Sequence, residues 1–515
     1  MNGAQSLVKT LLAGGVDVCF SNPGTSEMHF VAALDSVPGM RCVLALFEGV
    51  ATGAADGYYR LSGRPASTLL HLGPGLANGL ANLHNAKKAG SGVVNIVGEH
   101  ATGHIALDAP LTSDIEGLAR PMSNFVRVAT SSATVGADGA AAVTAARTPP
   151  GGIATLILPG DAAWDPGGVT VTPEAAPMRP VADDSALSAA ADALAKGKGT
   201  LLLLGGAALD TEGLEWAGRI AAKTGCDLLS EWANARLERG VGRVAIRRIP
   251  YVVEQAVDLL KDYERIVLVG ARRPVAFFAY PDKPGILVPD RCEIIPAAGA
   301  GDDLIDALAA LADRLGATGT PPSGIAQTGR PEVADGPLDP TSIGSVLGAT
   351  LPEGAVVIDE SITSGRNFFA ATAGAPPHSW LNNLGGSIGF SLPLAIGAAI
   401  AAPERKIIAL VGDGSAYYTI QALWTMARED LDITVVVFSN RLYRILMGEL
   451  TNVGVDNPGP RALDMLSLSN PETDWVQMAR SMGVDGVRVT DGRSFEKAMT
   501  TALTEPHPRL IEVVL

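Results

Sequence analysis

A short apolar run that ends in a glycine turn constrains this chain more than any other feature. Residues 407–411 read IIALV and are followed by Gly412, Asp413, Gly414 and Ser415. The β-branched apolar run predicts a buried strand, and the two glycines let the backbone turn tightly and bring its N–H groups close to a ligand. The helix predicted next (ALWTMA) presents its N-terminus to the same place. We therefore expect an anion-binding turn at the end of this strand.

A second apolar run is expected to place an asparagine beside this turn. Residues 433–438 (ITVVVF) predict another strand, and Asn440 follows it. The 27 positions from Asp413 to Asn440 hold one helix and one strand, so both side chains can emerge at the carboxyl ends of neighbouring parallel strands, where α/β sheets bind ligands. Two hard oxygen donors with a backbone carbonyl suit Mg²⁺, whose other ligands are usually phosphate oxygens. A glycine turn alone would fit an ordinary βαβ unit, but the added Asn440 favours a cofactor site.

This spacing resembles the cofactor signature of the thiamine diphosphate (ThDP) enzymes in the pyruvate oxidase, acetolactate synthase and benzoylformate decarboxylase family. The resemblance covers nearly the whole chain and is strongest in residues 15–85 and 383–446. It implies an α/β fold of three doubly wound parallel-sheet domains. These are a pyrimidine-binding domain (1–165), a Rossmann-like middle domain (185–318) and a diphosphate-binding domain (339–515), joined by Pro- and Gly-rich linkers at 166–184 and 319–338.

Length and composition are consistent with a cytoplasmic enzyme. The chain has 515 residues, enough for about three domains, and its net charge of −15 argues against nucleic acid and anionic membranes as partners. The apolar stretch 389–402 is too short to span a bilayer, and we expect no signal peptide. The cysteines form no CxxC pair, which indicates a reducing compartment and no structural zinc; they are Cys19, Cys42, Cys226 and Cys292.

Glu48 is the residue that the first domain is expected to contribute to the cofactor chemistry. It follows VLALF and opens a helix of small residues, GVATGAADGYYR. A carboxylate at a helix N-terminus is favourable by itself, so the position also has a purely structural explanation. The segment resembles the family's pyrimidine-binding helix, however, and Glu48 falls on its activating glutamate. The resemblance implies that Glu48 binds the aminopyrimidine ring of ThDP and so assists removal of the proton at thiazolium C2.

Two more residues of the first domain are candidates for substrate contact. His71 lies at a strand end before a Gly-Pro-Gly turn, and Thr25 lies in the turn NPGTSE. A lone histidine is more often structural than catalytic, and Thr25 could simply cap a helix. Both segments resemble benzoylformate decarboxylase. That resemblance implies that His71 relays protons to reaction intermediates and that Thr25 holds the substrate carboxylate.

The middle domain shows no dinucleotide fingerprint. Gly205, Gly206 and Gly270 are isolated turn glycines, and nothing reaches G-x-G-x-x-G. We therefore expect no functional FAD, in contrast to the oxidase and acetolactate synthase branches. Benzoylformate decarboxylase also contributes a second histidine from the loop after this region. The matching segment here offers Phe277 and Phe278 instead, so a two-histidine relay is not expected and these two residues are expected to line the substrate pocket.

The resemblance assigns further residues of the third domain to the cofactor and the substrate. Thr363 lies in the loop VVIDESITSG, which faces the diphosphate, and Gly386 offers its carbonyl to the 4′-amino group. Ile388 wedges between the two cofactor rings, unless it is plain core packing. Leu442 supplies the third protein ligand of Mg²⁺ through its carbonyl oxygen. The remaining positions line the cofactor and substrate side, with an acid where the decarboxylase has an aromatic residue: Tyr443, Ile445, Leu446 and Glu449.

The resemblance favours non-oxidative decarboxylation of a 2-oxo acid, with carboligation as a side activity. The alternatives are an acetolactate synthase-like carboligase and, from another class, an inactive ThDP-binding or regulatory subunit. Retention of Glu48, Asp413 and Asn440 argues against the last. In this family one site takes its glutamate and its aspartate from two chains, so we expect a homodimer as the smallest active unit and a homotetramer by symmetry. The sequence does not identify the 2-oxo acid.

Overall fold

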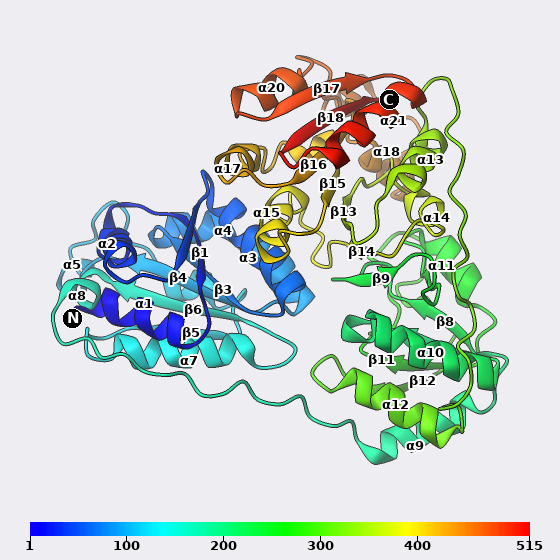
Figure 1. The fold of residues 1–515 in the computed structure, drawn as a ribbon, viewed down its shortest axis with the longest axis horizontal. Helices are drawn as coiled ribbons and strands as arrows, with labels where there is room; N and C mark the ends of the chain where they lie inside the picture. Colours follow the sequence, from blue (N-terminus) through cyan, green and yellow to red (C-terminus); the bar gives the residue numbers. More distant parts are fainter.

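Three separate β-sheets organise the computed structural model, which describes residues 1–515 (Figure 1). Each sheet is built from short apolar strands that alternate along the chain with helices, and the helices cover the sheet faces. This confirms the predicted class of three parallel-sheet α/β domains. None of the helices is both long enough and apolar enough to cross a lipid bilayer.

The first sheet is parallel throughout, in the order β2-β1-β3-β4-β6-β5. Its central strands are buried along their whole length, as expected for strands covered on both faces. The strands are β1 (Val18–Asn22), β2 (Arg41–Leu44), β3 (Ala66–Leu70), β4 (Val93–Glu99), β5 (Phe125–Val128) and β6 (Ile153–Pro159). The helices are α1 (Gly3–Ala13), α2 (Met28–Ser36), α3 (Glu48–Ser62), α4 (Leu72–Ala89), α5 (Thr102–Ile105), α6 (Ile115–Ala119), α7 (Val135–Arg147) and α8 (Gly160–Trp164).

The second sheet is also parallel, in the order β10-β8-β7-β11-β12. Its strands are β7 (Thr200–Leu204), β8 (Asp227–Ser230), β10 (Arg247–Arg248), β11 (Arg265–Val269) and β12 (Glu293–Ala298). The helices around it are α9 (Asp184–Leu194), α10 (Thr211–Thr224), α11 (Val253–Leu260) and α12 (Leu304–Arg314). Residues 166–183 cross to this domain as an extended segment (Figure 1).

The third sheet has the order β17-β18-β16-β15-β13-β14-β9. Its strands are β9 (Leu237–Arg239), β13 (Val356–Glu360), β14 (His378–Leu381), β15 (Ile407–Gly412), β16 (Ile433–Ser439), β17 (Asp485–Val489) and β18 (Arg509–Val514). The helices are α13 (Pro340–Thr350), α14 (Phe368–Ala371), α15 (Ser391–Ala401), α16 (Asp413–Ala416), α17 (Ala422–Arg428), α18 (Arg444–Asn452), α19 (Pro460–Asp464), α20 (Trp475–Ser481) and α21 (Gly492–Thr504).

One strand of the third sheet comes from the segment assigned above to the middle domain. β9 pairs antiparallel with β14, with Leu237 opposite the buried Trp380. The middle segment therefore closes an edge of the third sheet, and the chain does not divide into three independent pieces. The pairing of β9 with β14 crosses the expected boundary between the middle and third domains. The domain limits expected from the sequence therefore stay predictions.

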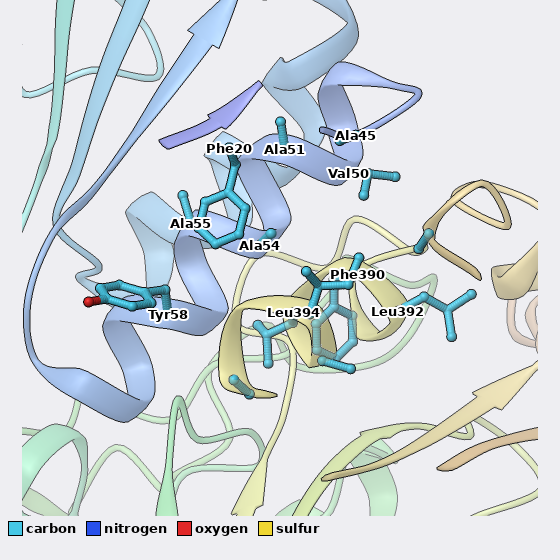
Figure 2. Close-up of a cluster of buried hydrophobic side chains, with 14 of the residues drawn as sticks. Phe20, Ala45, Val50, Ala51, Ala54, Ala55, Tyr58, Phe390, Leu392 and Leu394 are labelled. Carbon is cyan, nitrogen blue, oxygen red and sulfur yellow. The ribbon is translucent and has the colours of Figure 1, made fainter. Parts of the chain in front are cut away.

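The first and third domains pack through α3 and α15, where small residues let the two backbones touch. A Cβ added to Gly57 would lie 2.0 Å from the carbonyl oxygen of Leu394, and one added to Gly397 would lie 1.8 Å from that of Ala54. Figure 2 shows Ala54 of α3 on the side of Leu394 and Phe390 at the start of α15, whereas Tyr58 points away from them and contacts Phe20. One continuous apolar core thus serves both domains.

Arg60 joins all three domains at their meeting point. Its guanidinium forms a buried ion pair of 2.6 Å with Asp56 on the same helix. It also donates to the carbonyl oxygen of Asn382 in the third domain at 2.7 Å and to that of Ala235 in the middle segment at 3.4 Å. Because a buried guanidinium needs its charge and donors satisfied, this arrangement fixes the segment that leads into residues 383–388.

Candidate active site

Asp413 and Asn440 lie at the ends of two adjacent strands, as the spacing predicted. β15 and β16 are parallel neighbours, with Gly412 opposite Phe438. Asp413 begins α16 directly after β15, and Asn440 follows β16. The helix that begins at the turn is the four-residue α16. The predicted ALWTMA helix is α17, which starts only after a further turn, so it does not present its N-terminus there.

Backbone donors hold both side chains in place. One carboxylate oxygen of Asp413 accepts from the Gly414 N–H at 2.8 Å and the other from the Arg441 N–H at 2.6 Å. The amide oxygen of Asn440 accepts from the Leu442 N–H at 3.0 Å. Burial raises the pKa of the Asp413 carboxyl, and the N–H donors oppose this rise. Each of these oxygens has a second lone pair, so both side chains retain capacity to bind a cation.

The turn itself leaves open space where a ligand's phosphates would approach. Gly412 has a φ of −71°, which any residue can adopt, and an added Cβ there would meet nothing closer than the Glu360 carbonyl oxygen at 3.9 Å. Internal packing therefore does not require this glycine. At Gly414, by contrast, the Tyr443 ring would lie 2.5 Å from an added Cβ. An open glycine next to a carboxylate and an amide oxygen fits a Mg²⁺–diphosphate group.

The donor set suits magnesium bound together with a phosphate better than a metal held by the protein alone. No group of three or more His, Cys, Asp or Glu side chains forms a metal cluster in the structure. Mg²⁺ commonly uses one or two protein carboxylates and completes its shell with phosphate oxygens and water. Leu442, the expected backbone ligand, already accepts from the Arg444 N–H at 2.7 Å and keeps one lone pair. Ser415 is buried within α16, and Thr363 is half-buried in the turn after β13.

The loop that carries Gly386 and Ile388 is hydrogen-bonded to α4 of the first domain. His84 Nε2 contacts the Gly385 carbonyl oxygen at 3.0 Å. The Asn85 side chain makes two hydrogen bonds to the backbone of Ser387, at 2.9 and 3.2 Å. Gly386 has a φ of +81°, a conformation that favours glycine, and Ile388 is half-buried. The first domain of the same chain thus shapes this loop.

Glu360 anchors the other end of that loop and was missed in the sequence analysis. Its carboxylate is fully buried and accepts from the Gly389 N–H at 2.5 Å and the Ser391 N–H at 2.8 Å, at the start of α15. Burial raises its pKa to about 7. The only signal in the sequence is an acid at the end of the apolar strand VVIDE.

Glu48 is the first residue of α3 and lies against α4. Its side chain is 6% exposed, and one carboxylate oxygen accepts from Asn78 Nδ2 at 3.0 Å. The other oxygen lies 3.2 Å from where a Cβ on Gly75 would be. A carboxylate with so few donors around it can bind a protonated ring nitrogen, which is the role expected for Glu48.

His71 occupies the N-cap position of α4, and its side chain contacts a buried carboxylate that the sequence analysis did not single out. Its Nδ1 lies 2.8 Å from Oε2 of Glu27, which also accepts from the Gly24 N–H at 2.8 Å. Ser26 Oγ lies 3.3 Å from the same ring nitrogen. Thr25 is exposed beside this cluster. The available signal for Glu27 was its position in NPGTSE, three residues after Gly24.

The predicted substrate-side residues of the second and third domains also come together. Phe277 and Phe278 stack edge to face, with ring centroids 4.7 Å apart, and Phe278 contacts Tyr280. Burial and a hydrogen bond to Glu449 of α18 raise the pKa of Tyr280. Ile445 is half-buried on the same helix, and Leu446 is 41% exposed. The loop after β11 therefore faces α18.

Two sequence profiles match the chain. The profile "Thiamine pyrophosphate enzyme, N-terminal TPP binding domain" matches residues 1–119. The profile "Thiamine pyrophosphate enzyme, C-terminal TPP binding domain" matches residues 365–513. These ranges include Glu48 and His71 in the first match and Asp413 and Asn440 in the second.

Individual proteins are similar over the full length. The chain is 50% identical to "Putative acetolactate synthase large subunit IlvX" of Mycobacterium tuberculosis, covering 100% of this chain and 99% of that protein. It is 28% identical to benzoylformate decarboxylase of Pseudomonas aeruginosa, covering 97% and 96%. A Rhodococcus jostii ThDP-dependent 4-hydroxybenzoylformate decarboxylase superposes with a TM-score of 0.86 at 23% identity, covering 99% and 98%. The last likeness concerns the fold alone.

Proposed function

Because the chain belongs to the thiamine pyrophosphate (ThDP) enzyme family of 2-oxo acid decarboxylases and carboligases, we propose that it decarboxylates a 2-oxo acid without an oxidant. The observation that carries this proposal is the pair formed by Asp413 and Asn440 beside the open glycine Gly412. These residues would hold Mg²⁺ and the diphosphate of ThDP. When bound, the cofactor supplies the electron sink that lets the bond to CO₂ break.

The chain's own groups would then bind and move protons. Glu48 would hold the aminopyrimidine ring through its poorly solvated carboxylate, while Gly386 would offer a backbone carbonyl and Ile388 would fix the angle between the two rings. His71, oriented by Glu27, would deliver a proton to the substrate-derived carbon. Thr25, exposed next to it, would bind the substrate carboxylate.

The proposed assembly places these residues in two chains. We propose a homodimer in which Glu48 of one chain and Asp413 of the other complete each site, and a homotetramer built from two such dimers. Mixing inactive Glu48→Gln protein with inactive Asp413→Ala protein should then restore activity in mixed dimers. Verified mixed dimers without activity would contradict the shared site.

The free cysteines and the acidic charge support a cytoplasmic location.

Carboligation is the second candidate, and the 50% identity to "Putative acetolactate synthase large subunit IlvX" favours it. In that case a second carbonyl compound, in place of a proton, would take up the carbon left after CO₂ is lost. The third reading, a protein that binds ThDP without turnover, is disfavoured because Glu48, Asp413 and Asn440 are all present.

A turnover assay separates these functions. The purified chain with ThDP and Mg²⁺ should release CO₂ from at least one member of a panel of 2-oxo acids, with benzoylformate and pyruvate among them. Aldehyde as the product supports decarboxylation, and an acyloin or acetolactate supports ligation. ThDP binding without any CO₂ release would support the inactive subunit. Calorimetry that detects no ThDP binding would overturn the proposal as a whole. Purified protein should also lack a flavin absorption band at about 450 nm, because the sequence of the middle domain contains no dinucleotide fingerprint.

A further inference from the structure

A cavity lies at the carboxyl edge of the middle sheet, and of the predicted substrate-side residues only Phe277 lines it. Its volume is about 250 Å³. Segments that follow three parallel strands supply most of its wall: Glu231 and Trp232 after β8, Tyr251 after β10, and Arg272, Arg273 and Phe277 after β11. Leu384 of the third domain closes one side.

The position of the cavity is one where open α/β sheets bind ligands. The chain runs from β7 outward through β8 to β10, then returns to β11 and β12 on the other side. The strand order therefore reverses between β7 and β11, and the crevice at the carboxyl ends of such strands is the usual ligand site. A Cβ on Gly205, just after β7, would lie 2.6 Å from the Gly270 carbonyl oxygen and 2.9 Å from Oε2 of Glu231. Glu231 fits here because position 205 lacks a side chain.

Three aromatic rings form one wall of the cavity. Trp232, Tyr251 and Phe277 contact one another pairwise, with ring centroids 5.4 to 5.8 Å apart and tilted or edge-to-face planes. Such a wall offers ring faces and edges to a flat apolar group, and aromatic pairs of this geometry are favourable beyond the area they bury.

Two guanidinium groups and one carboxylate supply the charge. Arg272 is paired with Glu231, its Nε lying 3.4 Å from Oε1. Arg273 also lines the cavity, is exposed, and has no carboxylate partner. Glu231 is the only acidic residue in the lining, against these two arginines. The cavity is therefore positive at its entrance, and guanidinium groups bind carboxylates through paired hydrogen bonds.

We propose that this cavity binds a small aromatic carboxylate, with its ring against Trp232, Tyr251 and Phe277 and its carboxylate on Arg273. The volume of about 250 Å³ lies just below the range of about 300–1,000 Å³ for drug-sized ligands, so it suits a smaller ligand of one ring and its substituent. The ligand contacts the chain through the aromatic wall and the guanidinium group of Arg273.

This cavity is connected to the loop that carries Gly386. The Phe277 ring rests on that glycine, since a Cβ there would lie 2.6 Å from Cζ of Phe277, and Leu384 belongs to the same loop. A ring bound in the cavity would therefore contact Phe277 and Leu384, which lie next to Gly386, the proposed cofactor contact. Ligand and ThDP binding are expected to be coupled, and by linkage the coupling is reciprocal. This coupling rests on the proposed function, whereas binding in the cavity does not.

Calorimetry on the full chain tests the binding, with benzoate as the probe. Benzoate should bind about tenfold or more tightly than benzyl alcohol, because a hydrogen bond to a charged group contributes about that factor. Arg273→Gln should remove this preference and leave benzyl alcohol binding unchanged. Arg291→Gln is the matched control. It is exposed in the same domain and donates to the Lys261 carbonyl oxygen, away from the cavity, so it should bind benzoate like the wild type.

Two outcomes overturn the proposal. The first is equal benzoate affinity in the wild type and Arg273→Gln. The second is benzoate binding that is lost in His71→Ala but kept in Arg273→Gln, which would place the probe in the catalytic site. For the coupling, the Kd of ThDP is measured with and without saturating benzoate. An unchanged value in a protein that binds both overturns the coupling, and a protein that binds benzoate but never ThDP overturns the proposed function.

Discussion

Nδ1 of His71 lies 2.8 Å from Oε2 of Glu27, whose side chain is 1% exposed. Glu27 is itself fixed, because Ser26 Oγ donates to its other oxygen at 3.0 Å and Gly98 packs so closely that a Cβ there would lie 1.7 Å from it. A carboxylate held in this way keeps the imidazole proton on Nδ1 and leaves Nε2 to exchange protons with a substrate.

Replacing Glu27 by Gln should therefore lower kcat/KM about tenfold to a hundredfold. Gln can accept a hydrogen bond from Nδ1 but lacks the carboxylate charge. Binding of ThDP should not change, because Glu27 touches His71 and not the proposed cofactor residues. Ser26→Ala is the control, since it removes the 3.3 Å contact with His71 and the 3.0 Å hydrogen bond to Glu27 but keeps the carboxylate 2.8 Å from Nδ1, so it should keep most activity. Unchanged kcat/KM in Glu27→Gln would mean that the pair is structural.

Glu48 and His71 should affect different steps. Glu48→Gln should slow deuterium exchange at C2 of added ThDP, measured by quenching without any substrate. His71→Ala should leave this exchange nearly intact yet reduce kcat/KM by about 10² to 10⁴, the usual effect of a positioned acid or base. If His71→Ala turns over its best 2-oxo acid at the wild-type rate, His71 is structural.

Cofactor binding should weaken with falling pH through Asp413. A metal ligand must be deprotonated, and burial raises the pKa of this carboxyl. As the pH falls, Asp413 therefore gains its proton at a higher pH than an exposed aspartate would. The Kd of ThDP with Mg²⁺, measured from pH 8 to pH 5, should rise across this range. Asp413→Ala should abolish binding, while Asp456→Ala, at an exposed position beyond α18, should not. Tight binding in Asp413→Ala would remove this residue from the site.

Glu360 should make the chain less stable as the pH rises. Its pKa is about 7 in the folded chain against an ordinary value of 4.5. Between these values the folded chain retains a proton that the unfolded chain has released, so the free energy of unfolding decreases with increasing pH. The loss is on the order of 3 kcal/mol, because one pKa unit corresponds to about 1.4 kcal/mol.

Glu360→Gln cannot titrate and provides the comparison. The melting temperature of the wild type relative to this variant should be higher at pH 5 than at pH 8, measured without cofactor. The same difference at both pH values would show that Glu360 does not titrate in this range.

Packing of α3 on α15 should tolerate no side chain at Gly57. A Cβ there would lie 2.0 Å from the Leu394 carbonyl oxygen, so Gly57→Ala must separate two backbones and should cost about 1–3 kcal/mol or more. Gly448→Ala is the matched control, since that glycine lies in α18 with nothing within 4 Å of the added Cβ. It should be neutral or stabilising by up to about 1 kcal/mol. Equal melting temperatures for the two variants would contradict the observed helix contact.

Local patterns were sufficient for the parts of the site that lie at strand ends. IIALV and ITVVVF became β15 and β16, and their parallel pairing brought Asp413 beside Asn440. Glu48 begins α3, as the change from apolar to small residues predicted. In each case the information lies within one strand, one turn and one helix.

Contacts between distant segments could not be predicted in this way. The partner of His71 is 44 positions away, and Glu360 binds an N–H group 29 positions away. β9 joins β14 across 139 positions, counting from Arg239 to His378, and a three-residue strand carries little pattern of its own. These contacts depend on which surfaces meet after the strands and helices have formed, and hydrophobic periodicity does not encode that choice.

The contact between α3 and α15 determines when this chain can complete its first domain during synthesis. The two helices are separated by more than 300 positions, so α3 leaves the ribosome with one face uncovered until residues 391–401 have followed. At about 5–20 residues per second, that interval lasts on the order of tens of seconds. During this time the face of α3 that carries Ala54 and Gly57 is available to molecular chaperones and to neighbouring nascent chains.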